Sequence, residues 1–484
     1  MSARALARPA PRGARELLRD LAALALGEGV AKLAGFAAFA YLARTLSAAH
    51  YGAVELASAI TMLFFLVVDF GFAPIGAREL AADRSRARWL AAAIPTLRLA
   101  LALASIACIA LLSLLLDQPA ETRAFVRWFG LSLIAAPWVL NWLFQGLGQM
   151  LTVAIAQALR MLGFAALVLV LVRGDAALGA VAAAEIGSVV LLALYYLAMQ
   201  TRAVGPPRLE RDLVGLGRLL REAAPVGASR ILWALSQYGG TLVVASLAPA
   251  AELAWYGAAH RLAIALGGFV QLYHFNLFPT LVEAARGPSE RLREFLTPQL
   301  RASGWLAAFG GVFAAAFGAP LCALVYGAPF ARSGDLLAWL AWSLAAALVG
   351  SHARFVLLAT GRQRAELAAN AAGAAVALLG ALALVPAFGT RGAALAVVAG
   401  ALAVWATAHG IARRAGLALP SLVALVRPAL AAAAALAALA WLPVAGQLAW
   451  SASVVAAFAL AAPLVDPALR ADLLRLARTR GAPG

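Results

Sequence analysis

A long series of apolar segments, each close to the length of a membrane-crossing helix, sets what this chain can fold into. A helix needs about 20 apolar residues to cross a bilayer, and lipid-exposed irregular backbone is not stable there. We find about fourteen such segments and therefore predict an all-α integral membrane protein with about 14 transmembrane helices. The predicted spans are 22–44, 53–77, 90–116, 128–147, 150–172, 178–200, 223–248, 254–283, 299–326, 335–360, 367–386, 392–412, 429–444 and 448–465.

The composition agrees with a bilayer environment. Of the 484 residues, 64% are hydrophobic and 13% are charged, whereas soluble domains carry about 25% charged residues. The net charge of +17 raises the question of nucleic acid, but the arginines lie in short gaps and form no continuous basic face, so no nucleic-acid partner is expected. Cys108 and Cys322 both lie within apolar segments, which indicates neither a disulfide nor a zinc site. We expect no cofactor and no metal.

The arginines fill alternate gaps between the apolar segments and nearly avoid the others. Because cytoplasmic loops collect Lys and Arg, this pattern predicts that both termini are cytoplasmic. The basic residues before the first apolar run are Arg4, Arg8, Arg12, Arg15 and Arg19. A signal peptide is the alternative, but the run to Leu46 is too long for its apolar core, so a retained first helix is favoured.

The segment 201–222 contains Gly-Pro-Pro and many charges and marks a boundary. It separates a six-helix lobe in 1–200 from a second one in 223–412, and 413–484 adds a helix pair and a basic tail. We predict 201–222 to be a cytoplasmic linker.

The two predicted lobes are related in sequence. Tyr51 and Gly52 align with Tyr256 and Gly257, and the same shift aligns Pro74 with Pro279. An even number of helices separates the copies, so the repeat is parallel, and substrate sites of such transporters lie where the repeats meet. The matching positions make Pro74 and Pro279 candidate hinges.

Several cations lie inside the apolar spans, where a charge at the bilayer centre costs roughly 2.5–3.5 kcal/mol. They are Lys32, Arg98, Arg160, Arg230, Arg261, Arg301 and Arg354. Arg301 and Arg354 lie close to the cytoplasmic surface, where snorkelling explains them. The others are Lys32, Arg160, Arg261, Arg230 and Arg98. We expect these five to line a cationic central cavity, because arginine suits phosphate through paired donors.

Buried acids are fewer and are candidates for ion coupling or gating: Glu28, Glu55, Asp69 and Glu185. Glu28 precedes Lys32 by four positions, so the two share a helical face and are expected to pair. A neutral pair that only stabilises the bundle is the alternative. His260 and His274 also lie within a span, and we interpret them as hydrogen-bonded packing residues.

Several motifs resemble one known family. LARTLSAAHYGAVELASAI followed by DFGFAPIGAREL, then LFQGLGQM, LREAAPVGASRILWAL and AWYGAAHRLAIAL, is similar to the polysaccharide-biosynthesis and O-antigen (oligosaccharide) flippases. They belong to the multidrug/oligosaccharidyl-lipid/polysaccharide exporter superfamily. The resemblance implies a V-shaped pair of six-helix bundles in the bacterial inner membrane. Arg261, in YGAAHR, and Asp69, in DFGFAP, are the candidate site residues that lie in a recognisable motif.

The resemblance also implies a function. The family moves undecaprenyl-pyrophosphate-linked oligosaccharides, including precursors of lipopolysaccharide, to the outer leaflet by alternating access. The expected partners are this lipid-linked substrate, membrane lipids and a coupling ion, either proton or sodium.

Two other functions stay open. The first is a multidrug or organic-cation antiporter on the same scaffold, although such a site should be acidic, and this chain buries more cations than acids. The second is a glycan polymerase or ligase. Outer loops are short, and the chain lacks the G-x-x-x-x-G-K-[ST] motif of P-loop nucleotide hydrolysis. We therefore do not expect an enzyme.

Overall fold

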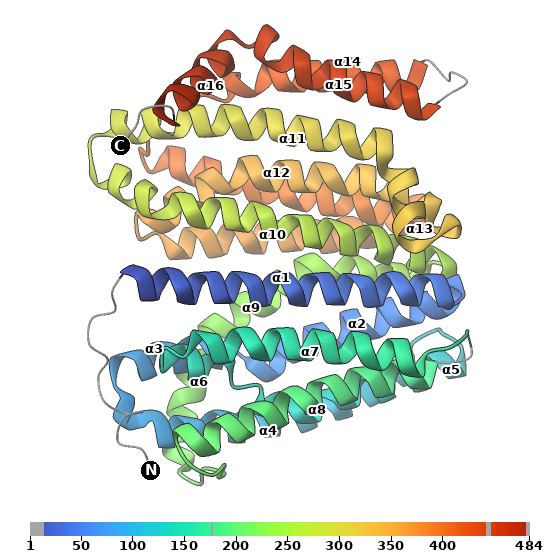
Figure 1. The fold of residues 1–484 in the computed structure, drawn as a ribbon, viewed down its shortest axis with the longest axis vertical. Coiled ribbons are helices and arrows are strands. Elements are labelled where there is room, and N and C mark those ends of the chain that lie inside the picture. The colour runs from blue at the N-terminus through green and yellow to red at the C-terminus, as the bar shows by residue number, and fades with distance from the viewer. Residues whose placement is uncertain (1–13, 176–177, 442–446, 481–484) are drawn as a thin grey trace. The chain divides into compact units, whose positions relative to one another are not determined.

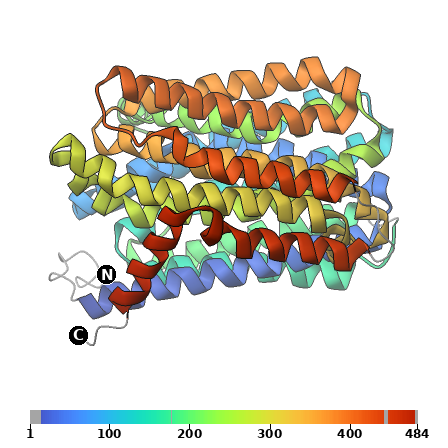
Figure 2. The ribbon, with the colours of Figure 1, turned by 90° about the horizontal axis from the view of Figure 1, so that it is seen from above.

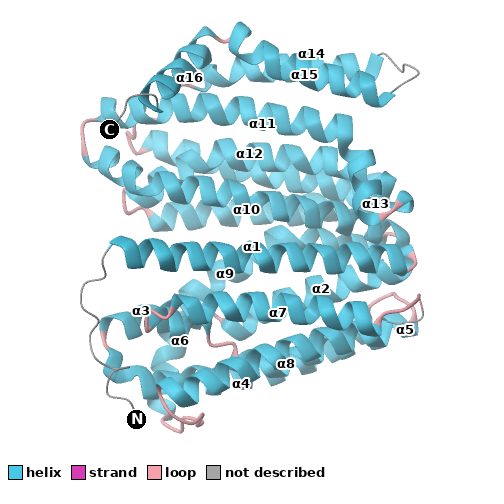
Figure 3. Cartoon of the chain, in the orientation of Figure 1, coloured by secondary structure: helices cyan, strands magenta, loops and turns pink. Residues whose placement is uncertain are grey.

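The computed structural model describes residues 14–175, 178–441 and 447–480. Within this part of the chain the regular elements are helices, with no strand (Figure 3), which confirms the all-α prediction. Arg4, Arg8 and Arg12 of the predicted cytoplasmic N-terminus, and residues 442–444 of a predicted span, lie outside the described residues.

The chain divides into two compact units, Met1–Tyr238 and Gly239–Gly484. The elements that begin in unit 1 are α1 (Ala14–Thr45), α2 (Ala48–Asp69), α3 (Phe72–Ala82), η2 (Arg84–Arg86), α4 (Ala87–Leu115), α5 (Ala120–Gly130), η3 (Leu131–Trp138), α6 (Asn141–Gly146), α7 (Met150–Leu171), α8 (Leu178–Ala203) and α9 (Leu213–Leu247) (Figure 1). The boundary between the units lies inside α9. The assignment of segments to lobes and linker remains a prediction.

The elements of unit 2 are α10 (Ala250–Arg286), α11 (Ser289–Tyr326), η4 (Ala328–Arg332), α12 (Ser333–Ala359), α13 (Gln363–Arg414), η5 (Leu422–Leu425), α14 (Val426–Trp441), α15 (Gln447–Val465) and α16 (Pro467–Arg480). Helices α14 and α15, drawn in orange-red and red, pack against each other and against α11 (Figures 1 and 2).

Twelve helical stretches of the described chain are long and apolar enough to cross a membrane. Helix α9 is 35 residues long but is not among these twelve. Helix α13, counted once among the twelve, is 52 residues long, far more than the ~20 that one crossing needs. With α13 divided in two, the structure agrees with the prediction of about fourteen spans, and the chain is a multi-pass membrane protein.

Helix α13 is a helical hairpin. Gly389 has φ 57° and ψ −140°, which interrupts the helix there, and only glycine adopts such angles without strain. On either side the chain returns on itself, because a Cβ at Gly373 would meet the backbone of Gly400 at 2.9 Å. The two arms correspond to the predicted spans 367–386 and 392–412.

The predicted span 53–77 is not continuous. Helix α2 ends at Asp69, and Phe70 (φ 41°) and Gly71 (φ 80°) both have left-handed backbone before α3 begins. Pro74 lies in the first turn of α3, where a missing N–H breaks no helical hydrogen bond. The bend lies at residues 70–71, and the ring of a proline disfavours helix at the residue four positions before it, here Phe70. The role of Pro74 as a hinge remains a prediction.

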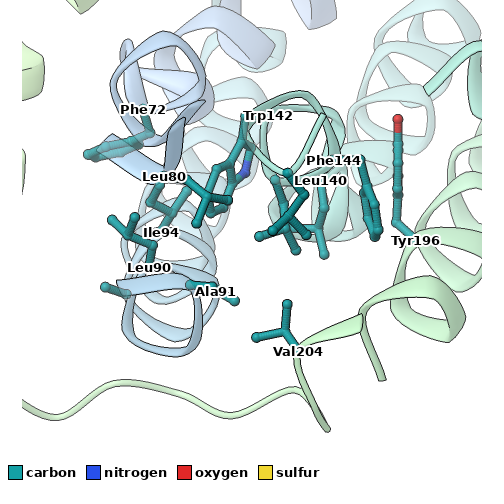
Figure 4. Close-up of a cluster of buried hydrophobic side chains, with 14 of the residues drawn as sticks. Phe72, Leu80, Leu90, Ala91, Ile94, Leu140, Trp142, Phe144, Tyr196 and Val204 are labelled. Atoms are coloured by element: carbon teal, nitrogen blue, oxygen red, sulfur yellow. The ribbon is translucent and has the colours of Figure 1, made fainter. Parts of the chain in front are cut away.

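A large apolar cluster joins α3, α4, α6 and α8 within unit 1. Trp142, Phe144 and Tyr196 are almost completely buried in it, and the Phe144 and Tyr196 rings stack at 5.6 Å (Figure 4). Side chains of this size hold the helices around them in fixed positions. The cluster thus fixes α4, the helix that carries Arg98.

The predicted linker 201–222 is non-helical only over 204–212. Helix α9 starts earlier than expected because Asp212 caps it: its carboxylate accepts hydrogen bonds from the amides of Val214 (3.1 Å) and Gly215 (3.0 Å). Acidic and small polar residues are strong helix N-caps.

Candidate functional site

Asp69, the last residue of α2, brings two arginines together. It is buried, and one of its oxygens accepts a hydrogen bond from Arg98 of α4. The other oxygen accepts from Arg230 of α9 at 2.5 Å. A carboxylate at the carboxyl end of a helix faces the negative end of the helix dipole. It therefore needs these cations, and with two of them the cluster keeps one positive charge in excess.

The two arginines of this cluster differ in exposure. Arg98 is only 3% exposed and also donates to the carbonyl of Val139 at 3.0 Å. Val139 follows the 3-10 helix η3, so its carbonyl lies outside any α-helix, and at membrane depth such a group needs a partner. Arg98 is thus held inside the protein, unlike the accessible cavity cation that the sequence suggested. The Arg230 side chain is 44% exposed and is the accessible cation of the cluster.

The backbone around Asp69 explains how α9 approaches so closely. Phe70 is the one residue other than glycine with positive φ among the described residues, and a bulky residue there indicates strain that the surrounding packing must offset. Gly227 of α9 lies against it: an added Cβ would come within 2.6 Å of the Phe70 carbonyl oxygen. Gly227 therefore allows the contact that brings Arg230, almost one turn later, to Asp69.

A second ion pair joins α7 and α8. Arg160 donates to Glu185 at 2.6 Å, and its guanidinium also lies 2.9 Å from the Met161 sulfur. The Arg160 side chain is 29% exposed and that of Glu185 11%. The pair is partly buried yet accessible from one side.

The expected pair of Glu28 and Lys32 is present on α1, with 3.4 Å between its charged atoms. Both side chains are more than half exposed. Helix α1 packs parallel to α7: Gly27 lies against Ala154, and the Phe39 and Phe164 rings are 5.6 Å apart. In this register Lys32 lies at nearly the same level as Arg160.

The remaining predicted site residues lie elsewhere. Glu55 is buried in α2 and Arg261 is half-buried in α10. Pro279 is exposed inside the continuous helix α10, unlike Pro74 at the start of its helix, so the two candidate hinges have different surroundings. Arg354 does not simply reach toward the surface, because it pairs with Glu366 at 2.6 Å.

Two features were not anticipated from the sequence. Arg301 pairs with Asp472 and lies 4.0 Å from Asp466, two acids of the C-terminal segment. His274 contacts His352, a residue that no sequence pattern distinguishes in its apolar span. Each of these contacts joins residues far apart in the chain, and a single sequence offers no signal for such pairs.

A pocket of about 360 Å³ lies elsewhere in unit 1, between α4, α8 and the segment 204–212. Arg88, Trp89, Gln200 and Arg208 are among its lining residues. Its apolar floor includes Ala91 and Val204, at the edge of the cluster in Figure 4. None of the predicted site residues lines this pocket, so it is separate from the ion pairs described above.

The ion pairs that contain Glu28, Asp69 and Glu185 have a simple chemical consequence. Four cations (Lys32, Arg98, Arg160 and Arg230) share three carboxylates, and three of these cations have accessible side chains. Exposed charges in the middle of membrane-length helices need water or an ionic partner, since lipid would not solvate them. The arrangement suits an anion that competes with the carboxylates for the accessible cations.

Solved structures with the same fold are membrane transporters. The lipid II flippase MurJ in an inward closed conformation matches with a TM-score of 0.73 at 10% identity, over 93% of this chain and 99% of that one. A MOP superfamily transporter from Pyrococcus furiosus, whose binding pocket of reverse polarity suggests a different function, matches with a TM-score of 0.57 at 15% identity, over 82% and 95%. The eukaryotic MATE transporter AtDTX14 follows with 0.53 at 14% identity, over 91% and 99%.

At these identities the likeness shows the fold alone. No curated protein matches the chain in sequence. A family model described as polysaccharide biosynthesis protein matches residues 17–285, more than half of the 484 residues. The chain therefore belongs to the polysaccharide biosynthesis protein family and has the fold of the MOP superfamily transporters.

Proposed function

We propose that this protein is a flippase that moves an undecaprenyl-pyrophosphate-linked oligosaccharide from the inner to the outer leaflet of the bacterial cytoplasmic membrane by alternating access. The observation that carries the proposal is the excess of cations over carboxylates among the ion pairs that contain Glu28, Asp69 and Glu185. A pyrophosphate headgroup supplies the missing negative charge, and guanidinium groups bind it through two parallel hydrogen bonds. Family membership and the flippase fold of MurJ support the same function.

The residues divide into two roles. Lys32, Arg160 and Arg230 are the accessible cations and bind the headgroup, with Arg261 of α10 as a further candidate. Arg98 is a positioning residue, because it is buried and fixes Asp69. When an anion binds Arg230, Asp69 keeps Arg98 as its partner, so no buried charge is left bare.

The carboxylates are then the switching elements. Asp69 and Glu185 hold the cations while the substrate is absent, and each releases part of its contact when the headgroup arrives. Glu28 does the same for Lys32. Glu55 remains a gating candidate on the same helix as Asp69, and Pro279 remains a hinge candidate in α10.

A multidrug or organic-cation antiporter is the second candidate, since a MATE transporter shares the fold. A cationic drug would be attracted to the carboxylates of the cluster. The excess of arginine and lysine around them opposes this, because each carboxylate already has a cation bound. A transport assay with both substrate classes separates the two functions.

The test uses the purified protein in liposomes that contain a fluorescent undecaprenyl-pyrophosphate oligosaccharide. Translocation is measured as the fraction of glycan that becomes accessible to a membrane-impermeant glycosidase. We expect Lys32→Gln, Arg160→Gln, Arg230→Gln and Arg261→Gln each to lower the rate at least about tenfold, the equivalent of roughly 1.4 kcal/mol of binding free energy.

The matched control is Arg391→Gln. Arg391 also forms an ion pair, with Asp335 at 3.2 Å, but both side chains are about two-thirds exposed. Its loss should leave the rate unchanged. Normal transport in all four site variants would refute the proposal, and transport of organic cations but not of the lipid would favour the antiporter.

The identity of the glycan requires a cellular experiment. In a strain that lacks the gene, the lipid-linked precursor should accumulate on the cytoplasmic face of the membrane. Mass spectrometry of the undecaprenyl-linked pool then identifies the sugar. An unchanged pool would contradict a role in flipping this class of lipid.

A further inference from the structure

Two histidines of unit 2 are in direct contact inside the protein. His274 lies on α10 and His352 on α12, and their ring centroids are 4.9 Å apart with 74° between the ring planes. They are 2% and 4% exposed. The contact joins two helices that both belong to the candidate membrane spans.

The hydrogen bonds of the two rings fix which nitrogen carries hydrogen in the neutral form. The Nδ1 of His274 lies 2.9 Å from the carbonyl of Val270, and the Nδ1 of His352 lies 3.0 Å from that of Val349. A carbonyl oxygen only accepts, so both Nδ1 atoms must donate. The Nε2 of each neutral ring is then a bare acceptor.

Neither Nε2 has a hydrogen-bond partner in the described part of the chain. Buried polar atoms without partners are rare, and each one calls for an explanation such as a bound ion. Here two of them belong to touching rings. One added hydrogen would satisfy both atoms, because the Nε2 that carries it becomes a donor and the other Nε2 accepts from it.

We call His274 and His352 the dyad. The groups around it are mostly apolar or neutral. The Phe355 ring lies 5.2 Å from that of His274, and the Tyr273 hydroxyl donates to Gln299 of α11 at 3.1 Å. The charged neighbour that acts on His274 is Arg354 of α12. Its charge is offset by Glu366 of α13, at 2.6 Å. Within the described residues, the hydrogen bonds and ring contacts of the two imidazoles involve no carboxylate.

We propose that His274 and His352 together bind one proton, shared between their Nε2 atoms as an N–H···N hydrogen bond. Two imidazoles joined in this way have centroids about 5 Å apart, which the observed contact allows. The proton adds to one Nε2 lone pair, the second Nε2 accepts the resulting N–H, and no other bond changes. The bound form links α10 to α12, and the unbound form leaves both Nε2 atoms without a hydrogen-bond partner.

In transport, the dyad would be the binding site of the coupling ion. That ion would then be a proton and not sodium. This role rests on the proposed function, whereas the binding of the proton does not. Helix α10 also carries Arg261 and Pro279, so a contact that forms and breaks with the proton acts on the helix that holds a candidate substrate residue. Outward movement of substrate would then be exchanged for inward movement of a proton.

The first test measures proton binding without substrate. The full-length protein with ¹⁵N-labelled histidine is titrated in detergent from roughly pH 9 to pH 4, the range in which histidine charge changes, and the imidazole signals are followed by NMR. We expect the signals of His274 and His352 to shift together in one step. In His274→Gln the titration of His352 should change, and in His352→Gln that of His274 should change.

The control is His409→Gln in α13, a half-buried histidine outside the dyad, which should leave both dyad signals as they are. If one dyad variant fails to fold, the other alone decides the result. Independent titration of the two rings, as expected if a water bridges them, would overturn the proposal. So would a pair that binds no proton across this range.

The second test measures coupling in liposomes with an imposed pH gradient. The wild-type protein should drive the lipid-linked substrate against its own gradient, and His274→Gln should still carry it downhill but ignore the pH gradient. A wild-type protein that binds the proton but moves no lipid would contradict the proposed function and would leave the proton-binding proposal standing. A variant that still responds fully to the pH gradient would contradict the coupling role of the dyad.

Discussion

Two carboxylates of this protein, Asp69 in unit 1 and Asp466 in unit 2, each bring two arginines together, yet their surroundings differ. Asp69 lies at the carboxyl end of α2, where the helix dipole disfavours negative charge. Asp466 precedes α16 and accepts hydrogen bonds from the amides of Ala468 and Leu469, both at 3.2 Å. The first carboxylate depends on its arginines, and the second is stabilised by the helix that it caps.

The other partners of Asp466 strengthen this difference. It also accepts from the Trp305 indole at 3.0 Å and from Arg427 at 3.3 Å, so it ties the C-terminal helices to α11. Its many partners indicate a permanent contact. In the described part of the chain, the partners of Asp69 are the cations Arg98 and Arg230. Exposure of an arginine does not distinguish the two sites, because the Arg230 side chain is 44% exposed and that of Arg427 54%. We therefore expect Asp69 to exchange its partners during transport and Asp466 to keep its partners.

The largest effect is expected for Asp69→Asn, which tests directly whether the Asp69 site differs from the Asp466 site. The substitution leaves Arg98 buried without its counter-charge, and such a loss costs about 3–5 kcal/mol. The free energy of unfolding in detergent should fall by that amount, and transport should be lost. The double variant Asp69→Asn/Arg98→Met should recover much of the stability but no transport. Equal stability losses for Asp69→Asn and Asp466→Asn would show that the two sites do not differ as argued.

Gly227→Ala tests whether close packing of α9 positions Arg230. Its Cβ would come within 2.6 Å of the Phe70 carbonyl oxygen, so backbone must move, and such overpacking costs about 1–3 kcal/mol. Transport should fall because Arg230 moves away from Asp69. Gly310→Ala in α11, where nothing lies within 4 Å of an added Cβ, is the matched control and should change neither property. An unaltered transport rate in Gly227→Ala would show that transport does not depend on the contact between Gly227 and Phe70.

Asp466→Asn should have a smaller effect than Asp69→Asn. Asparagine still caps α16, but its amide nitrogen cannot accept the hydrogen bond of one of the present donors. We expect a loss of about 1–2 kcal/mol in the free energy of unfolding, with the transport rate preserved. A loss of transport without a loss of stability would place Asp466 in the transport mechanism.

The fold was largely predictable from the sequence, and the pairing of its charges was not. Apolar segments of membrane length and the arginine alternation are local patterns, and they sufficed even for the two arms of α13, where Gly389 marks the turn. The pair of Glu28 and Lys32 was predictable because it lies within one helix turn. Arg160 and Glu185 meet across two helices, and nothing local indicates this.

The same limit applies to the surroundings of Pro74 and Arg98. A proline within an apolar run suggests a kink, but whether it starts a helix depends on the backbone at Phe70 and Gly71, which packing with α9 stabilises. Arg98 has the depth of a cavity residue in the sequence. Only the fold shows that a broken helix places the Val139 carbonyl beside it and turns it inward.

The smallest expected effect is the pH dependence of the Asp466 contact. Burial alone would raise the pKa of Asp466, but the Trp305 indole, the Leu469 amide and the nearby Arg301 and Arg427 outweigh it, so the pKa is lowered. A lowered pKa in the folded state means that the carboxylate stabilises the fold above the ordinary value of about 3.9. That stability is lost as the pH falls through the folded pKa.

The unfolding midpoint of the wild-type protein in detergent should therefore drop between roughly pH 5 and pH 3, over and above the change that other carboxylates cause. Asp466→Asn carries no titrating group at this position and should show a shallower drop, because its fold is already without the ionic contact at pH 7. Asp335→Asn is the control, since Asp335 is exposed and pairs with the exposed Arg391, and an exposed pair of this kind contributes little. If Asp466→Asn and the wild-type protein lose stability in parallel as the pH falls, Asp466 is not the anchor of the C-terminal helices. The contrast with Asp69 is then limited to the helix end at which each carboxylate lies.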